Sequence, residues 1–227
     1  MTTWCPSPNF SERRGGLQAQ YVVLHYTAMD SARAAIDRLC APEFEVSAHY
    51  VIDEHGRVTQ LVDEAHRAWH AGRSFWQGCE DMNSASIGIE LCNRGTHPFP
   101  HPQMQQLRSL LAGITRRWSL PRSHVIGHSD IALGRKTDPG SRFDWRGLAR
   151  DGFGLWPQEH TAINDPAQFL DHAAQVGYDV AVGVHPVLQG FRLHFAPHRV
   201  GALGPDDCAD MASLAHQTVV DQTPPSA

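Results

Sequence analysis

Short runs of apolar, β-type residues alternate with segments of helical periodicity along the first two thirds of the chain. Residues 21–25, 86–91 and 125–127 have the clearest strand patterns. Residues 49–52 and 58–61 flank a glycine-containing turn, which predicts a β-hairpin. Strands that alternate with helices are typical of a sheet covered by helical layers. The pattern therefore predicts an α/β fold in which helices flank a mixed central sheet.

Two segments between these strands have the composition and spacing of helices. Residues 31–40 are rich in alanine, and Asp30 or Ser31 can cap the N-terminus of that helix. A second helix is expected to open at Pro102. Its apolar side chains recur at helical spacing, at Met104, Leu107, Leu111, Ile114 and Trp118. We expect these apolar positions to lie in the core and not to contact a cofactor.

The strand at residues 86–91 has two chemically different faces, because successive side chains point to opposite sides of a sheet. Its isoleucines and leucine point to one face, which is predicted to be core. Gly88 and Glu90 point to the other face, and the small Gly88 leaves room beside the carboxylate. We expect Glu90 to face a cleft, where His25 could join it; the alternative is an ion pair between Glu90 and a neighbouring arginine.

The last third of the chain has a different pattern. Residues 158–165 predict a linker, and Pro166 suits the first turn of a helix. Three helical patterns follow, at residues 169–176, 187–195 and 208–215. Residues 166–220 therefore predict a small three-helix domain, which is marginally stable alone at this size. Residues 221–227 predict a disordered tail.

The composition excludes several classes of function. The chain has 227 residues, of which 41% are hydrophobic, and this is enough for a substantial core. Its formal charge of -5 provides no basic surface for nucleic acid. We find no apolar stretch of membrane-spanning length and no signal-peptide pattern at the N-terminus. We therefore expect a monomeric cytoplasmic protein without a nucleic-acid partner or membrane segment; a misassigned start site would allow a periplasmic or envelope location.

Residue types that bind metals are concentrated in one short segment. Residues 127–140 contain a histidine, a lysine and two aspartates, the mixture that a hydrolytic zinc site uses. A catalytic zinc ion takes three protein ligands and leaves a fourth position for water. Two ligands would come from this loop, and His25, at the end of an apolar strand, is the best candidate for the third. The scattered cysteines lack metal-site spacing and predict reduced thiols, at Cys5, Cys40, Cys79, Cys92 and Cys208.

Five short motifs follow one another along residues 1–157. They are His25-Tyr26-Thr27, Val46-Ser47-Ala48-His49-Tyr50, Ala68-Trp69-His70-Ala71-Gly72, Ser86-Ile87-Gly88-Ile89-Glu90-Leu91, and the loop from Gly127 to Gly140. In this order they resemble the zinc-dependent N-acetylmuramoyl-L-alanine amidases of the amidase type 2 family, and within it the AmpD and AmiD branch. The resemblance implies that residues 1–157 form a catalytic domain with this family's α/β fold.

The resemblance also implies the ligands of the metal. His25, His128 and Asp138 would hold one zinc ion per chain, with water in the fourth position. Asp130 is the competing carboxylate in the same loop. Its position matches a family residue that is not a ligand, so we expect it to orient the loop or a ligand imidazole.

Four further residues receive roles from the resemblance. Glu90 would take a proton from the bound water and pass it to the departing amine. Lys136 would stabilise the oxyanion of the tetrahedral intermediate. His70 is predicted to contact substrate, with a packed, hydrogen-bonded histidine as the alternative. Arg135 is predicted to bind a carboxylate of the substrate peptide, with a solvated arginine as the alternative.

The implied reaction is hydrolysis of the amide between N-acetylmuramic acid, or its 1,6-anhydro form, and L-alanine of peptidoglycan stem peptides. The partners would be muropeptides or murein, in cell-wall turnover or recycling. The predicted helical domain resembles, more weakly, a peptidoglycan-binding-like module; the alternative is an appendage that only docks. A non-catalytic peptidoglycan-recognition protein is the main alternative function, although such proteins typically lack a zinc ligand. A zinc peptidase would be expected to contain His-Glu-x-x-His, which is absent.

Overall fold

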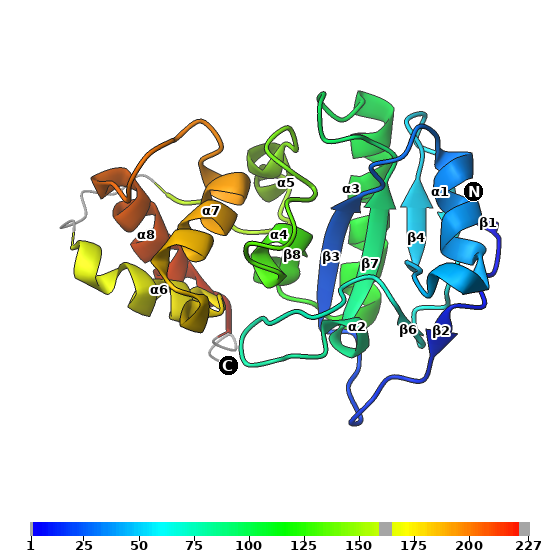
Figure 1. Ribbon diagram of the computed structural model, residues 1–227, viewed down its shortest axis with the longest axis horizontal. Coiled ribbons are helices and arrows are strands. Elements are labelled where there is room, and N and C mark those ends of the chain that lie inside the picture. Colours follow the sequence, from blue (N-terminus) through cyan, green and yellow to red (C-terminus); the bar gives the residue numbers. More distant parts are fainter. Residues whose placement is uncertain (1, 159–164, 223–227) are drawn as a thin grey trace.

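The computed structural model describes residues 2–158 and 165–222, with a six-stranded mixed sheet at the centre (Figure 1). In spatial order the strands are β1 (Thr2–Trp4), β5 (Val58–Gln60), β4 (Tyr50–Ile52), β7 (Ser86–Leu91), β3 (Tyr21–Tyr26) and β8 (Val125–Gly127). Strands β4, β7, β3 and β8 are parallel, whereas β5 is antiparallel to β4 and parallel to β1. The predicted α/β fold with a mixed sheet is confirmed.

Helices flank this sheet and continue beyond its β8 edge (Figure 1). They are α1 (Ala32–Cys40), α2 (Met82–Ala85), α3 (His101–Trp118), α4 (His128–Ile131), α5 (Trp145–Arg150), α6 (Phe169–Val176), α7 (Val184–Phe195) and α8 (Pro205–Gln222). Short 3-10 helices lie at Pro42–Phe44, Arg122–His124, Pro166–Gln168 and Val180–Val182. A separate antiparallel pair joins β2 (Phe10–Ser11) and β6 (Arg67–Ala68).

The longer elements and the three-residue strands β4, β5 and β8 agree with the hydrophobic pattern, whereas other short elements are not predicted by it. Helix α1 begins after Ser31, whose side chain accepts a hydrogen bond from the backbone N–H of Ala34, as the capping rule predicts. The hairpin is confirmed by the antiparallel pairing of β4 and β5. Strand β1 and helices α2, α4 and α5 have three to six residues each, too few for a hydrophobic period to be recognised.

One face of the central strands packs against α3, as the alternation of side chains predicts. Residues of β3 and β7 form a single buried cluster with the apolar side of this helix; its members include Val22, Leu24, Ile87, Ile89, Leu91, Met104, Leu107, Leu111 and Ile114. The same strands point the alternate set of side chains to the opposite face. That face carries His25 and Glu90, which are direct partners in the parallel register of β3 and β7.

The three predicted C-terminal helices are α6, α7 and α8, and their buried apolar residues belong to a core shared with the sheet. Phe169, Phe191 and Met211 of this helical segment are fully buried in the same cluster as Tyr21 and Val23 of β3. The segment is therefore packed onto the sheet domain through a continuous apolar core, which favours the docking interpretation.

The predicted boundaries of this segment can be compared only in part. Most of the predicted linker, residues 159–164, lies outside the described residues, as do residues 223–227 of the predicted tail. Helix α8 continues to Gln222, so the first two residues assigned to the tail are helical. All five cysteines are free. Within the described ranges, no helix is both long and apolar enough to span a membrane.

Candidate metal centre and active site

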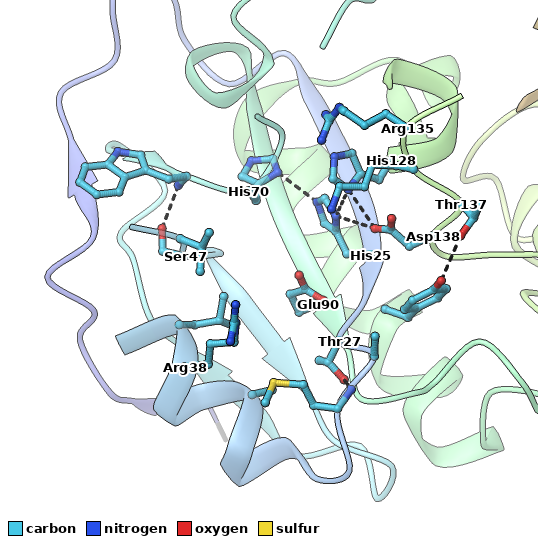
Figure 2. A pocket seen from close by; sticks show the side chains of 18 residues that line it. His25, Thr27, Arg38, Ser47, His70, Glu90, His128, Arg135, Thr137 and Asp138 are labelled. Carbon is cyan, nitrogen blue, oxygen red and sulfur yellow. Dashed lines mark hydrogen bonds and ion pairs between the residues drawn. The ribbon is translucent and has the colours of Figure 1, made fainter. Parts of the chain in front are cut away.

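The candidate site lies where the carboxyl ends of three parallel strands meet. His25 is the penultimate residue of β3, Glu90 is the penultimate residue of β7, and His128 follows β8 directly. Ligands of open α/β sheets commonly bind at the carboxyl ends of the strands. Figure 2 shows these side chains pointing toward one cavity, together with Asp138 from the loop after α4.

Three potential metal ligands converge at this point. The Nδ1 atom of His25 lies 3.0 Å from Nδ1 of His128 and 2.9 Å from Oδ2 of Asp138. The third edge of the triangle, from Nδ1 of His128 to Oδ2 of Asp138, is 3.0 Å. A tetrahedral zinc ion with ligand bonds of roughly 2.0–2.1 Å separates its ligand atoms by roughly 3.3 Å. The three buried side chains therefore lie close to a metal-binding geometry without rearrangement.

The hydrogen bonds made by Nε2 of His25 and of His128 determine which ring nitrogen of each has a free lone pair toward the candidate metal centre. His128 Nε2 lies 3.0 Å from the carbonyl oxygen of Ala71, so this nitrogen carries the proton and donates. His25 Nε2 lies 3.0 Å from Nδ1 of His70. His70 in turn places Nε2 at 3.3 Å from the hydroxyl of Ser86, which donates its own proton to a backbone carbonyl. His70 therefore donates to Ser86 and accepts from His25, which leaves the Nδ1 lone pairs of both His25 and His128 facing inward.

The charges of the three side chains fit a divalent cation. Burial lowers the pKa of His25 to about 4, so its imidazole is neutral at physiological pH. Burial acts to raise the pKa of Asp138, but its interactions with His128 and His25 outweigh it and hold the pKa below its usual value. Metal ligands must be deprotonated, and the neutral imidazole of His25 and the ionised carboxylate of Asp138 meet this requirement. Without a cation, three inward-facing lone pairs at 3 Å would repel one another.

Glu90 lies beside this centre in a chemically unusual environment. It lines a cavity of about 430 Å³, and its Oε2 atom has no hydrogen-bond partner among the described residues. Burial, and then the negative charge of Asp138, raise the pKa of Glu90 to about 8, while Lys136 opposes this shift. The alternative prediction, an ion pair with an arginine, is not found in the described part of the chain. A carboxylate held beside a cavity without a partner is available to a substrate or to water.

The cavity has walls from separate parts of the sequence (Figure 2). Arg38 and Leu39 of α1 lie on one side, and Trp69 and His70 border it from the segment after β6. The exposed side chain of Lys136 lines the same cavity from the loop that carries Asp138. The structure thus brings Glu90 and Lys136 to the same opening as the three candidate ligands.

His70 and Arg135 also border the cavity, but each is already engaged with the protein. His70 accepts a hydrogen bond from Nε2 of His25, on the side of that ring away from the candidate metal centre. The His70 ring also packs against Gly88, where an added Cβ would lie 2.5 Å from the ring. Gly88 therefore makes room for His70, whereas the sequence pattern had suggested that it makes room for Glu90. Arg135 donates to the carbonyl oxygens of Ala71 and Arg73, at 2.8 and 2.6 Å. Their predicted contacts with substrate stay predictions.

Two residues that position the site were recognised only partly, or not at all, from the sequence. Asp130 accepts a hydrogen bond from the backbone N–H of Gly127 at 2.7 Å, which agrees with a role in orienting the loop. No bond from Asp130 to either ligand imidazole is found among the described residues. Asn83 was not predicted; its side-chain oxygen accepts from the N–H groups of His70 and Ala71, at 2.9 and 2.7 Å. A buried asparagine in a short helix has no distinguishing sequence signal.

Known proteins are similar to this chain in sequence. The family described as N-acetylmuramoyl-L-alanine amidase matches residues 15–141, a range that contains every candidate site residue. The chain is similar to N-acetylmuramoyl-L-alanine amidase AmiD of Escherichia coli K12, with 36% identity over 211 residues, which cover 78% of this chain and 74% of the relative.

Solved structures are similar over nearly the whole chain, including the helical segment. The structure of AmpDh3 from Pseudomonas aeruginosa superposes with a TM-score of 0.80 at 30% identity, covering 91% of this chain and 95% of that one. The complex of Escherichia coli AmiD with the substrate anhydro-N-acetylmuramic acid-L-Ala-D-γ-Glu-L-Lys has a TM-score of 0.77 at 30% identity, covering 94% and 98%.

Proposed function

The chain belongs to the amidase type 2 family of N-acetylmuramoyl-L-alanine amidases, and we propose that it hydrolyses the amide between N-acetylmuramic acid and L-alanine of peptidoglycan stem peptides. The observation that carries this proposal is the buried triangle of His25, His128 and Asp138 beside the unpartnered carboxylate of Glu90. The substrate in the AmiD complex is an anhydro-muramyl tripeptide, which supports muropeptides as the substrate class, with the 1,6-anhydro sugar included.

One zinc ion is the proposed cofactor. His25 and His128 would bind it through Nδ1 and Asp138 through Oδ2, since these are the atoms that converge. Two imidazoles and one carboxylate are a common ligand set for catalytic zinc. A zinc ion bound there would polarise the substrate carbonyl and lower the pKa of water to roughly 7.

Glu90 is proposed as the general base and then the general acid. Its free carboxylate oxygen faces the cavity next to the ligand triangle, where it can take a proton from the attacking water. The same group can then deliver that proton to the amide nitrogen, so that the departing alanine leaves as a neutral amine. The raised pKa of Glu90 favours this return of the proton.

Lys136 is proposed to stabilise the oxyanion that forms on the carbonyl oxygen. It lines the same cavity and stands two residues before Asp138 in the sequence. A cationic donor at the point where negative charge develops lowers the barrier more than it strengthens ground-state binding.

The helical segment is proposed to extend the substrate-binding surface as well as to dock. A groove of about 490 Å³ lies between Lys136 and Thr137 on one side and α7 with its following loop on the other, where Leu188, Leu193 and Val200 supply an apolar lining. Because Lys136 and Thr137 also line the active-site cavity, the groove adjoins it. This position suits the part of a peptidoglycan substrate beyond the scissile amide.

The site has both three candidate metal ligands and a candidate general base, and this favours a catalytic function over a purely binding one. A binding module needs neither a full ligand triangle nor a carboxylate with a raised pKa, whereas amide hydrolysis uses both. The deciding experiment incubates the zinc-loaded protein with an anhydro-muramyl tripeptide and identifies the products by mass. Release of the sugar and the intact peptide is expected. Binding without any cleavage would leave the recognition function, and cleavage within the peptide would indicate a peptidase.

A further inference from the structure

Asp130 connects the metal-binding loop to the helical segment. One of its carboxylate oxygens, Oδ2, accepts from the N–H of Gly127, immediately before His128. The backbone N–H of Ser129 donates to the carbonyl of Asp138 at 2.9 Å, which ties the two ligand-bearing parts of the loop together. The position of Asp130 therefore affects where both loop ligands lie, although its carboxylate contacts neither.

Two side chains of the helical segment hold this carboxylate. His194 of α7 donates through Nδ1 to Oδ2 of Asp130 at 2.8 Å, and the hydroxyl of Tyr178 donates to Oδ1 at 3.1 Å. All three residues are at least 97% buried. Burial, and then Asp130, raise the pKa of Tyr178 well above its usual value, so its hydroxyl stays protonated and remains a donor.

Helix α7 lies directly against the turn that begins with His128. Gly190 of α7 approaches so closely that an added Cβ would lie 3.1 Å from the carbonyl oxygen of Ser129. The His194 ring is stacked between Trp145 and Phe195, with centroids 3.7 and 3.8 Å away. This packing fixes the orientation of the imidazole, so its bond to Asp130 is rigid.

The second ring nitrogen of His194 belongs to a side chain that borders a small cavity at the same interface. Nε2 of His194 and Nε1 of Trp76 have no hydrogen-bond partner among the described residues, and both side chains border a cavity of about 20 Å³. A water molecule needs about 10–15 Å³ measured in this way. Because the carboxylate of Asp130 accepts from Nδ1, a neutral His194 has its lone pair on Nε2, to which a water in this cavity could donate while it accepts from Trp76.

We propose that His194 and Tyr178 are positioning residues of the metal centre, which act through Asp130 on the loop that presents His128 and Asp138. This inference rests on the proposed zinc site. It gives the helical segment a function in catalysis separate from any contact with substrate. Outer residues that orient metal ligands commonly change metal affinity about 10- to 100-fold when they are replaced.

The test separates the hydrogen bonds from the packing. The double variant His194→Phe, Tyr178→Phe keeps both aromatic rings and removes both donors. We expect its dissociation constant for Zn²⁺, measured by competition with a chromophoric chelator, to rise about 10- to 100-fold. The visible spectrum of its Co²⁺ form should change, and kcat of the zinc-loaded form should fall. KM should be unchanged, because neither side chain lines the active-site cavity.

The single variant His194→Asn makes the opposite change. Its amide places a donor the same number of bonds from Cβ as the imidazole Nδ1, but it loses the stacking on Trp145 and Phe195. This variant should unfold at a lower temperature and still bind Zn²⁺ within a few fold of the parent. Weak zinc binding in the Asn variant, with parental binding in the Phe double variant, would show that packing and not Asp130 matters, and would overturn the proposal.

The matched control is Gln217→Met. Gln217 also crosses the interface, since it accepts from Arg122 and donates to the carbonyl of Trp156, but it does not touch the metal loop. It should lose stability and keep the parent's affinity for Zn²⁺. An equal loss of affinity in this control would assign the effect to general loosening of the interface and overturn the proposal. Failure of the parent itself to bind Zn²⁺ would refute the proposed function instead.

Discussion

The two faces of the β3–β7 strand pair differ in chemistry although neighbouring residues supply them. On the α3 face, Leu24 and Ile89 are fully buried in an apolar cluster. On the other face, His25 and Glu90 stand opposite each other at the edge of a cavity. The alternation of side chains along a strand separates the two sets, so a single step along the chain changes a residue's role from stability to chemistry.

The polar face carries groups that are unfavourable to bury, and the apolar face compensates for them. Desolvation lowers the pKa of His25 and raises that of Glu90, and both shifts disfavour the charged form of the group. Such groups cost stability unless they are paired. The apolar face contributes the compensating burial, so substitutions on the two faces should have separable effects on activity and on stability.

The largest expected effect comes from removing a ligand. His25→Ala, His128→Ala and Asp138→Ala should each lose stoichiometric zinc and all measurable turnover, because three protein ligands are the minimum for a catalytic site. Metal content by atomic absorption and turnover of an anhydro-muramyl peptide would be measured on the same samples. Chelation of the parent should also abolish turnover, and added zinc should restore it. If a variant still binds one zinc ion per chain, the residue replaced in it is not a zinc ligand.

Glu90→Gln is expected to have the next largest effect, and without loss of metal. The amide is nearly isosteric and no proposed ligand changes, so zinc content should stay at one per chain. Turnover should fall about 10²- to 10⁴-fold, the usual contribution of general acid–base catalysis. Single-turnover rates and zinc content check this. Parental activity would place the proton transfer elsewhere, with His70 the next residue to replace.

Lys136→Ala should also retain zinc, with a loss of about 10²- to 10³-fold in kcat, as for the removal of one oxyanion donor. KM should change less than kcat, because the interaction is made mainly in the transition state. Arg135→Ala is the comparison variant for the effect on kcat. The guanidinium of Arg135 is bound to the carbonyls of Ala71 and Arg73, so this neighbouring cation is not proposed to stabilise the oxyanion. A change confined to KM in Lys136→Ala would make this lysine a substrate-binding residue only.

In the metal-free protein, Glu90 on the polar face should make the free energy of unfolding depend on pH. The pKa of Glu90 is about 8 when folded and has an ordinary value of 4.5, so the folded state keeps a proton that the unfolded chain loses. Its stabilising contribution is present below about pH 4.5 and is lost as the pH rises through about 8. The parent should lose up to about 4 kcal/mol of unfolding free energy between about pH 5 and 8 for this reason. Glu90→Gln cannot ionise at this position and should not show this loss. Denaturant titrations of both proteins at several pH values test it; parallel pH profiles would contradict the raised pKa.

The hydrophobic pattern predicted the longer elements and the family motifs predicted the candidate ligands, whereas the remote contacts that position those ligands were not predicted. The alternation in residues 86–91 was enough to place Glu90 opposite the core face. The hydrogen bond from His25 to His70 spans 45 positions, and that from His194 to Asp130 spans 64. No local pattern records such a pair, because each histidine by itself is compatible with a packed or a solvated position.

The smallest expected effect belongs to the residue next to Glu90. Ile89→Val removes one buried methyl group from the α3 face, where Ile89 is fully buried, and should cost about 0.5–1.5 kcal/mol of unfolding free energy. Its side chain points away from the cavity, so zinc content and kcat should equal those of the parent. Denaturant unfolding and turnover at the same temperature measure both quantities. If Ile89→Val lowered kcat while the protein stayed folded, the two faces would be coupled through the strand, and the separation of stability from chemistry at adjacent positions would be wrong.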